Sequence, residues 1–385
     1  MRKSTDNTCA WEQRKVQDVA DRFDNLRIPV AANLRVHGTT PYYGANGIQD
    51  YVEGFTHDGE FVLVAEDGAN DLKNYPVKCV NGRIWVNNHA HVLQGKAGIS
   101  DNSFLAFAIS QSDIESLLVG GSRAKLNAET LMSIEFKLPC LQEQYRIGEY
   151  LTQLDNLITL HQRKYDKLVA IKRSMLEKMF PREGSCFPEI RFAGFTDPWE
   201  QRKVVDIASD TRGGGTPSTS NPAYWNGEIP WIQSSDLSDG KLFGVKPRKR
   251  ISRAGLNSSA TQLVPENSIA VVTRVGVGKL AFMPYSFTTS QDFLSLCRMQ
   301  TEPYFTVYSL YQMLQGELQA VQGTSIKGMT KDDLLSKFVF VPRSKDEQQQ
   351  IGLLFSRLDT LITLHQRKLE KLQAIKRSML EKMFV

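Results

Sequence analysis

Long apolar runs and paired cysteines are both missing from the sequence. The five cysteines among its 385 residues are Cys9, Cys79, Cys140, Cys186 and Cys297, an odd number without a C-x-x-C pair. This spacing suggests neither a disulfide framework nor a zinc site, so we expect free thiols. No stretch approaches the roughly 18 apolar residues of a membrane span, and residues 1–7 lack the apolar core of a signal peptide. We therefore expect a cytoplasmic protein without a membrane partner.

A strong excess of one charge is also lacking. The 47 lysines and arginines exceed the 42 aspartates and glutamates by only five, so net charge alone indicates no partner. The distribution says more, because Lys246, Arg248, Lys249, Arg250 and Arg253 follow one another with no acidic residue between them. Such a run is typical of a phosphate-facing surface, and it is equally compatible with a solvated loop.

The motifs of common enzyme classes are absent or incomplete. The stretch GVGKL at 276–280 has the wrong glycine spacing for a nucleotide phosphate loop. The stretch NPAY at 221–224 resembles the NPPY-type motif of adenine methyltransferases but lacks its second proline. No glycine-rich turn suited to S-adenosylmethionine accompanies it, which favours a simple turn before Trp225. We expect a non-catalytic chain, and the alternative is a self-contained adenine methyltransferase using Asn221 and Tyr224.

The strongest positive feature is an internal repeat. Residues 154–180 and 358–384 differ at only four of 27 positions, which indicates a duplication. A shorter pair, WEQRKV at 11–16 and 199–204, marks where each unit begins. The chain is therefore organised as lobe, helix, lobe, helix, with a connector containing glycine and proline at 182–198.

Each long repeat is predicted to be a helix that packs through an apolar stripe. Apolar residues recur at alternating steps of three and four, as in coiled coils. The two histidines on the stripe are expected to specify the register or to lie at its edge, rather than to act as ligands or bases. Lys172 and Lys376 interrupt the stripe, and we expect them to extend to solvent. The expected packing residues are Leu154, Ile158, His161, Leu168 and Met175 in the first copy, and Leu358, Ile362, His365, Leu372 and Met379 in the second.

The two lobes, by contrast, show little similarity to each other in sequence. In the first lobe, strands are expected at 61–65 and 83–86 and a helix at 111–119. In the second lobe, strands are expected at 268–273 and 279–283. Each lobe should therefore be a mixed sheet-and-helix domain. Near-identical helices joined to unlike lobes suggest two different targets recognised by equivalent placements, which fits a DNA site in two parts separated by a spacer.

Candidate DNA-binding residues are polar side chains beside aromatic residues or glycines. In the first lobe, Asn87, Asn88, His89 and His91 offer amides and imidazoles to bases or phosphates. The spacing of the two histidines also fits half of a metal site, but without a third ligand in the sequence pattern the metal interpretation is the weaker one. Loops at 120–125 and 322–327 occupy equivalent places in the two lobes and suit backbone contacts. The remaining candidates are Arg123 and Lys125 in the first of these loops, Lys327 in the second, Ser218, Arg274 and Lys279 beside glycines that equally suit hairpin turns, and the run Lys246, Arg248, Lys249 and Arg250.

Several longer motifs together resemble one known family. They are FPEIRFAGFTDPWEQRKV at 187–204, the duplicated LITLHQRK and AIKRSMLEKMF, GRIWVNNHAHVL at 82–93, and GGTPSTSNPAYWNGEIPWIQSSDL at 214–237. Over nearly its whole length, the sequence resembles the specificity subunits of type I restriction-modification systems. Residues 1–10 depart from the pattern, because they do not match the segment that precedes the second WEQRKV.

The resemblance implies an α+β fold in which two target-recognition domains, 1–140 and 199–343, alternate with two long helices, 141–181 and 344–385. It implies that these helices are antiparallel and coiled-coil-like, with pseudo-twofold symmetry. The implied partners are double-stranded DNA, two modification subunits and restriction subunits. Adenine N6 methylation, S-adenosylmethionine, ATP and magnesium would belong to those partners, so the chain itself is expected to bind no cofactor. A regulator built on the same scaffold without restriction partners is a further alternative.

Overall fold

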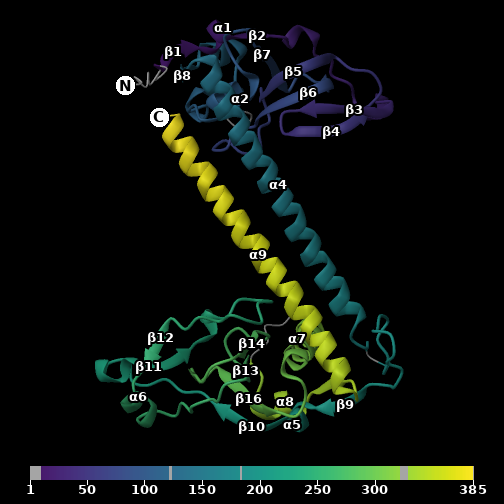
Figure 1. The fold of residues 1–385 in the computed structure, drawn as a ribbon, viewed down its shortest axis with the longest axis vertical. Coiled ribbons are helices and arrows are strands. Elements are labelled where there is room, and N and C mark those ends of the chain that lie inside the picture. The colour runs from purple at the N-terminus through teal and green to yellow at the C-terminus, as the bar shows by residue number, and fades with distance from the viewer. Residues whose placement is uncertain (1–9, 121–123, 183, 321–327, 385) are drawn as a thin grey trace, which may run out of the picture. The chain divides into compact units, whose positions relative to one another are not determined.

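The computed structural model describes residues 10–120, 124–182, 184–320 and 328–384 (Figure 1). The chain divides into two compact units, residues 1–163 with 366–385, and residues 164–365. Two long helices, α4 (Leu141–Lys178) and α9 (Lys345–Met383), each contribute to both units. Each unit therefore combines one lobe with parts of both helices, and the predicted long helices are confirmed. No helix within the described ranges is long and apolar enough to cross a membrane.

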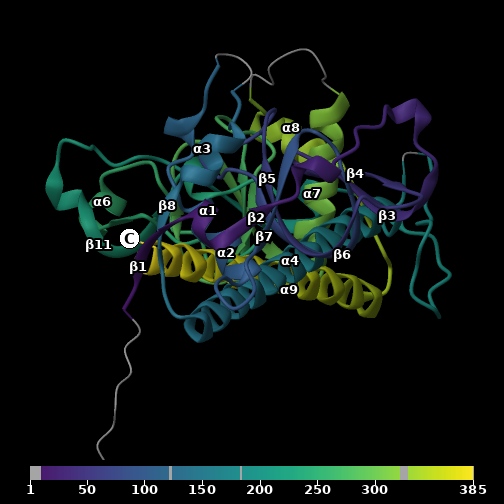
Figure 2. The same ribbon diagram turned by 90° about the horizontal axis from the view of Figure 1, so that it is seen from above.

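The first lobe is built on a six-stranded sheet. Its helix α2 (Asn102–Ser110) packs against β5 (His57–Ala65), β6 (Val77–Val86) and β7 (Ala90–Gly95) (Figures 1 and 2). The short helices α1 (Val16–Val19) and α3 (Ala128–Ser133) pack against each other. A second, two-stranded sheet pairs β1 (Glu12–Lys15) with β8 (Glu135–Leu138) just before α4. In spatial order, the main sheet consists of β2 (Ala20–Arg22), β7 (Ala90–Gly95), β5 (His57–Ala65), β6 (Val77–Val86), β3 (His37–Gly44) and β4 (Gly47–Val52).

The second lobe contains a four-stranded sheet, a three-stranded sheet and another two-stranded pair. The pair joins β9 (Glu200–Lys203) to β17 (Phe338–Val341) just before α9. In spatial order, the larger sheets are β10 (Ala208–Gly213), β16 (Phe293–Met299), β13 (Ser268–Val272) and β14 (Leu280–Met283), then β12 (Lys249–Ile251), β11 (Trp225–Ile232) and β15 (Thr288–Thr289). The helices of this lobe are α5 (Val204–Ile207), α6 (Arg253–Asn257), α7 (Pro303–Ala320) and α8 (Lys331–Ser336).

The two lobes share one core topology despite their dissimilar sequences. The antiparallel order β2-β7-β5-β6 in the first lobe is repeated as β10-β16-β13-β14 in the second. They differ in the next two strands, because β3 extends the main sheet by pairing in parallel with β6, whereas β11 and β12 belong to a separate sheet. The predicted mixed sheet-and-helix lobes are thus confirmed, and the strands expected at 61–65, 83–86, 268–273 and 279–283 fall within or over β5, β6, β13 and β14.

The prediction of a helix at 111–119 is wrong. The helix of this region is α2, which ends at Ser110, and the following stretch contains only a short 3-10 turn at Glu115–Leu117. Asp101 begins α2 by accepting a hydrogen bond from the Phe104 backbone at 2.8 Å. The stretch after Ser110 also contributes apolar side chains to the core, namely Ile114, Leu117 and Leu118, but it does so from turns, so apolar residues alone suggested a helix there.

Within each unit, the two long helices run antiparallel against the lobe. In the first unit, Trp11 lies next to Phe104 of α2 and Phe384 after α9, and its indole donates to Glu143 at the start of α4 (3.3 Å). The second unit repeats this arrangement with Trp199, Phe305, Phe180 after α4, and Glu347 at the start of α9 (3.2 Å). The two WEQRKV motifs therefore fix each lobe to the beginning of one helix and the end of the other.

Lys172 and Lys376 do not extend to solvent as expected. Lys172 forms an ion pair with Asp359 (2.5 Å), and Lys376 forms the equivalent pair with Asp155 (2.5 Å). Each ammonium also lies over an aromatic ring of its lobe, Tyr308 for Lys172 and Phe107 for Lys376. Each pair lies within one unit and connects the two helices there. The lysines do not extend to solvent because a carboxylate on the facing helix stabilises the ammonium in place of water.

The structure places the ten expected packing residues at different depths. Leu154 and Leu358 are buried, and Leu168, Met175, Leu372 and Met379 pack against the core of their own unit. Ile158, Ile362, His161 and His365 are half-buried and lie near the division between the units.

The expectation of free thiols holds for three cysteines. Cys79, Cys186 and Cys297 are free, whereas Cys140 is disulfide-bonded. The sequence spacing gave no sign of this bond, because the five cysteines are scattered and odd in number.

Candidate nucleic-acid interface

The turns after β3 and β6 and the loop after β5 contact one another in the first lobe. The Asn46 side chain donates to the Gly68 carbonyl (2.8 Å), which joins the β3–β4 turn to the loop after β5. His89, in the β6–β7 turn, bonds Asp67 of that same loop, and Asp67 pairs with Lys125 as an isolated bridge. We call Asn46, Asp67, Asn88, His89 and Lys125 the first loop face.

Of the residues predicted in this lobe, some are exposed on the first loop face and others are not. Asn88, His89 and Lys125 are exposed. Asn87 is buried and shapes the turn, because its side-chain oxygen accepts from the His89 backbone at 2.8 Å. His91 is buried inside the lobe at 1% exposure. Asn87 and His91 therefore do not present their side chains to DNA in this arrangement, and Arg123 lies outside the described residues.

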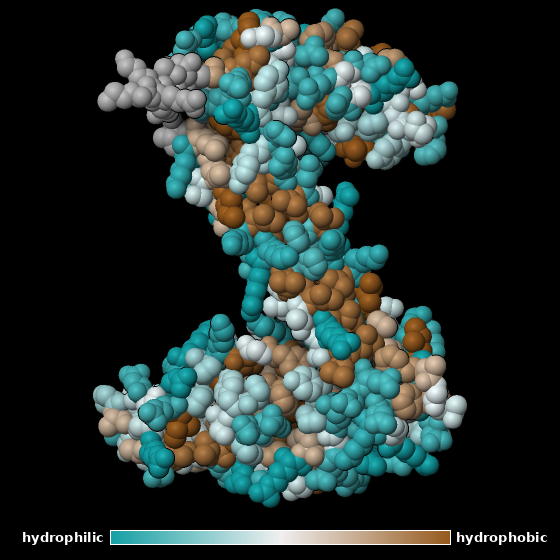
Figure 3. Space-filling model, viewed as in Figure 1, coloured by the Kyte–Doolittle hydropathy of each residue, from teal (hydrophilic) through white to brown (hydrophobic). Residues whose placement is uncertain are grey.

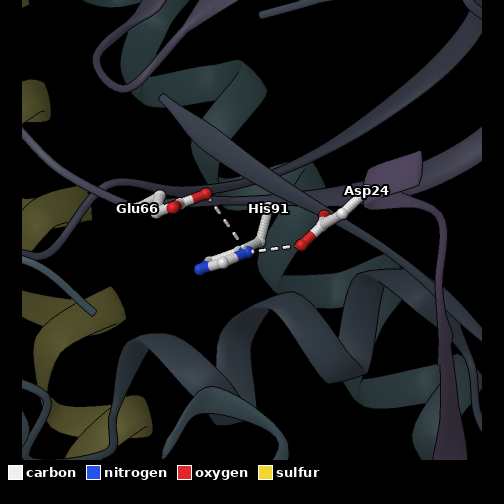
Figure 4. Close-up of side chains that lie close together, drawn as sticks. All are labelled: Asp24, Glu66 and His91. Atoms are coloured by element: carbon white, nitrogen blue, oxygen red, sulfur yellow. Dashed lines mark hydrogen bonds and ion pairs between the residues drawn. The ribbon is translucent and has the colours of Figure 1, made fainter. Parts of the chain in front are cut away.

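His91 is instead the most buried member of a cluster of charged side chains, three of which are drawn in Figure 4. Its Nδ1 is 2.7 Å from a carboxylate oxygen of Asp24, and its Nε2 is 2.9 Å from the Leu126 carbonyl. Arg27 donates to Glu66 (2.6 Å), and the Lys125 ammonium is 2.7 Å from the other oxygen of Glu66. We call Asp24, Arg27, Glu66, His91 and Lys125 the His91 cluster.

The charges of the His91 cluster keep both carboxylates ionised. Burial by itself raises the pKa of Asp24, but the hydrogen bonds from His91 and the Val92 backbone and the nearby positive charges outweigh it, so this pKa is lowered. Burial likewise opposes ionisation of Glu66, and the bonds from Lys125 and Arg27 lower its pKa below the usual value. Because Asp24 and the Leu126 carbonyl both accept hydrogen bonds, the His91 ring satisfies both only when each nitrogen carries a proton.

The His91 cluster also contains three side chains that approach as metal ligands do. One ligand atom from each of Asp24, Glu66 and His91 lies within 4.8 Å of the others. Arg27 and Lys125 already balance the carboxylates at hydrogen-bonding distance, so a divalent ion would add to a site that has its cations. His89 bonds Asp67 rather than Asp24, so the two histidines of the His89-x-His91 pattern do not share a site.

The second lobe has an equivalent loop contact and its own set of charged loop residues. Met329 donates to the Thr273 carbonyl (2.6 Å), as Leu126 donates to the Glu66 carbonyl (2.7 Å) in the first lobe. Lys279 lies 3.8 Å from Asp239, and Arg248 lies 3.3 Å from Asp236. Gly276 and Gly278 both have positive φ, so the turn itself explains these glycines. We call Asp236, Asp239, Arg248, Arg274 and Lys279 the second loop face, and Lys327 lies outside the described residues.

The rest of the basic run lies around Trp225. Lys249 is 5.5 Å from the Trp225 ring centre and 5.8 Å from that of Trp231, a cation–π arrangement. The Trp225 indole donates to the Ser218 carbonyl (3.0 Å). The structure thus brings predicted residues Ser218 and Lys249 together around an indole that the sequence prediction did not include. Lys246, Arg248, Lys249 and Arg250 are all exposed.

The NPAY stretch forms the turn that its sequence favours. Pro222–Tyr224 is a 3-10 turn, and the Asn221 side-chain oxygen accepts from the Ala223 backbone at 3.1 Å. Asn221 is therefore engaged in capping this turn.

Known proteins resemble the chain in both sequence and fold. Residues 10–170 and 196–374 each match the model of the type I restriction modification DNA specificity domain. A Haemophilus influenzae protein assigned to the type I restriction enzyme specificity subunits is 44% identical over 146 residues, which cover 38% of this chain and 38% of that protein. The EcoR124I/EcoR124II specificity subunit of Escherichia coli is 31% identical over 160 residues, 39% of this chain and 38% of that protein. The crystal structure of the type I restriction-modification S subunit from M. genitalium aligns with a TM-score of 0.71 over 99% of this chain and 98% of that one, at 12% identity.

Proposed function

Because the chain belongs to the type I restriction modification DNA specificity family, we propose that it recognises a two-part DNA sequence, with one part for each lobe. One observation carries this proposal: two lobes of the same core topology end in unlike loop faces. Equivalent frameworks with different side chains suit equivalent docking on two different half-sites.

The exposed cations support DNA as the target. Lys125 on the first loop face and Arg248 and Arg274 on the second are all exposed. Lysines and arginines at such positions contact phosphates and position a protein on the duplex, while amide and imidazole groups such as Asn88 and His89 bond base edges.

The two long helices support two copies of one partner. Apolar side chains are exposed along them in Figure 3. Leu157 and Leu160 of α4 are 43% and 46% exposed, and the repeated residues Leu361 and Leu364 of α9 are 43% and 45% exposed. Identical apolar pairs, equally exposed in the two units, suit two identical subunits. We propose that these partners are modification subunits.

The chemistry is assigned to the partners in this proposal. The chain binds no cofactor, and the modification subunits bind S-adenosylmethionine and transfer its methyl group to adenine N6. Restriction subunits that use ATP and magnesium would complete the assembly, which we place in the cytoplasm.

Reconstitution tests this assignment. The chain, a modification subunit of the same system, or both are incubated with genomic DNA and radiolabelled S-adenosylmethionine, and the methylated adenines are mapped. Only the mixture should methylate, and each modified site should contain two constant parts separated by a spacer of fixed length. Methylation by the chain alone, or modified sites with a single constant part, would contradict the proposal.

A further inference from the structure

Among the residues that the structure describes, the counterparts of His91 and Glu66 in the second lobe are uncharged. In the β5–β7 register His91 pairs with Val64, and the equivalent pair of β13 and β16 is Leu294 with Val271. The backbone carbonyls of Glu66 and Thr273 accept equivalent hydrogen bonds, from Leu126 before α3 and from Met329 before α8. Glu66 therefore corresponds to Thr273. The second lobe forms the same sheet with Leu294 and Thr273, so the fold does not require charges there. Buried charges that a fold can replace with apolar groups gain little stability, which indicates another role in the first lobe.

The charges of the cluster leave one cation in excess. Asp24 and Glu66 carry two negative charges. Arg27 and His91, whose two ring nitrogens both face acceptors, lie against them, and the more exposed Arg22 is 3.7 Å from Asp24. The Lys125 ammonium adds a third positive charge. Lys125 is also the exposed member, with 47% of its side chain accessible, whereas those of Arg27, His91, Asp24 and Glu66 are 15%, 1%, 11% and 12% accessible.

We propose that His91 is a positioning residue which, with Arg27, balances Asp24 and Glu66 and thereby leaves Lys125 available for a DNA phosphate. The proposal rests on the proposed function and deepens it, because it names how one cation of the first loop face is kept ready for DNA. When Lys125 turns to a phosphate, Glu66 still has Arg27 at 2.6 Å, so no buried carboxylate loses its partner. The Leu126 carbonyl bond of His91 also holds the segment next to Lys125 in place.

The charge balance predicts opposite effects for two substitutions. In His91→Leu, which copies the second lobe, Asp24 loses its bond from His91 and draws more on Arg27, which lies 3.5 Å away. Glu66 then depends more on Lys125, which is held there more strongly. In Glu66→Gln, the ion pair between Lys125 and Glu66 is absent, so Lys125 gives up no carboxylate when it binds a phosphate. The double variant His91→Leu with Glu66→Gln restores the balance of Asp24 with Arg27 and frees Lys125 again.

The test measures DNA affinity of the assembled complex over a range of salt concentrations, with a duplex that carries the mapped target. Lys125→Ala should reduce the salt slope by about 0.9 and weaken binding about eightfold at about 0.1 M salt, as expected for one lost phosphate contact. His91→Leu should show a similar loss, His91→Leu with Glu66→Gln should recover wild-type affinity, and Glu66→Gln alone should bind at least as tightly as wild type. Lys15→Ala is the matched control, because Lys15 is similarly exposed at 44% and pairs with Glu135.

Three results would overturn the proposal. They are equal affinity of the Lys125→Ala and Lys15→Ala complexes, a loss of affinity in Glu66→Gln, and failure of the double variant to recover a folded His91→Leu protein. The Glu66→Gln result holds even if His91→Leu does not fold. If these results appear while the wild-type complex still prefers its target over scrambled DNA, the role of the cluster fails and the proposed function stands. If the wild-type complex shows no such preference, the proposed function fails as well.

Discussion

At the scale of single residues, the stability of the first lobe is tied to the ionisation of Asp24 and Glu66. Both pKa values are lowered in the folded chain relative to the ordinary values of 3.8 and 4.5. Their contribution to stability is therefore fully present above those ordinary values and is lost as the pH falls through the lower folded values. Between about pH 5 and about pH 3, the first lobe should lose stability, and Asp24→Asn with Glu66→Gln should flatten this loss.

Pulse proteolysis in denaturant, with peptides of each lobe identified by mass spectrometry, checks this prediction. The second lobe serves as an internal control, because Leu294 and Thr273 stand where His91 and Glu66 do. An equal acid response of the wild type and the double variant in the first lobe would contradict it.

The three free thiols should differ in reactivity. Burial, followed by the charge of Glu60, raises the pKa of Cys79 to about 12, and burial also raises the pKa of Cys297. The thiolate is the reactive form, so both should resist iodoacetamide near neutral pH, whereas the exposed Cys186 should be alkylated. Mass spectrometry of the native protein after brief labelling measures the order, and labelling of Cys79 as fast as Cys186 would show that the first lobe is packed differently.

Sequence patterns predicted the exposed site residues better than the buried ones. Asn88, His89 and Lys125 are on the surface as expected, because turns and loops place polar residues outside. The burial of His91 was not predicted, because its hydrogen-bond partner Asp24 lies 67 residues away in the chain. A polar residue two positions after an exposed histidine gives no sign of that distant carboxylate, so only the fold shows which of the two histidines is internal.

At the scale of elements, the two ion pairs between the helices repeat one arrangement with different strength. In the second unit, the side chains of Lys172 and Asp359 are 12% and 20% exposed, and Tyr308 also donates to Asp359 at 2.6 Å. In the first unit, Lys376 and Asp155 are 25% and 41% exposed, and the neighbouring ring is Phe107, which has no hydroxyl group. The pair in the second unit is therefore the more deeply desolvated.

Removing the two lysines should accordingly have unequal effects. Lys172→Ala leaves the half-buried carboxylate of Asp359 without its cation and should destabilise the second unit by about 2–3 kcal/mol. Lys376→Ala breaks a more exposed pair and should cost the first unit about 1 kcal/mol or less. Pulse proteolysis of each full-length variant measures both values, and a larger effect for Lys376→Ala would contradict the ranking.

The helices themselves were predictable because a stripe of apolar residues recurs over many turns. The partners of their interrupting lysines were not, since Lys172 and Asp359 are separated by 187 residues. Heptad patterns identify the face that packs but not which charges on neighbouring helices meet. The error at 111–119 has a similar cause, because a short apolar stretch near the true helix carries too little periodicity to fix its ends.

At the scale of the whole molecule, the duplication was visible in the helices but not in the lobes. The sheet orders β2-β7-β5-β6 and β10-β16-β13-β14 are the same, while the residues that fill them changed. Buried positions tolerate exchange of one apolar side chain for another when volume is kept, so topology persists after sequence similarity is lost. The residues that stayed alike are those that join each lobe to the helices, Trp11 with Glu143 and Trp199 with Glu347.

The equal exposure of the two leucine pairs predicts the stoichiometry of the complex. Changing Leu157 and Leu160 to Asp should remove one of two modification subunits, and changing Leu361 and Leu364 should remove the other, because a charge on an apolar contact surface opposes burial. Sedimentation of the assembled complex measures the loss, with Gln153→Asp, at another exposed position of α4, as the control. Loss of both subunits from one pair of changes, or of neither, would contradict two separate sites.

Exchange of a whole lobe tests the modular recognition most directly. Residues 199–343 are replaced by the second lobe of another family member, chosen to keep the tryptophan that bonds Glu347 and an aromatic residue at Tyr308 beside Asp359, since these contacts join the lobe to its helices. The first lobe keeps its own loop face and its own contacts with Glu143. Mapping of methylated adenines should therefore show one half of the target replaced and the other half unchanged. A target altered in both halves would mean that the loop faces do not act independently, even though each lobe forms its own core.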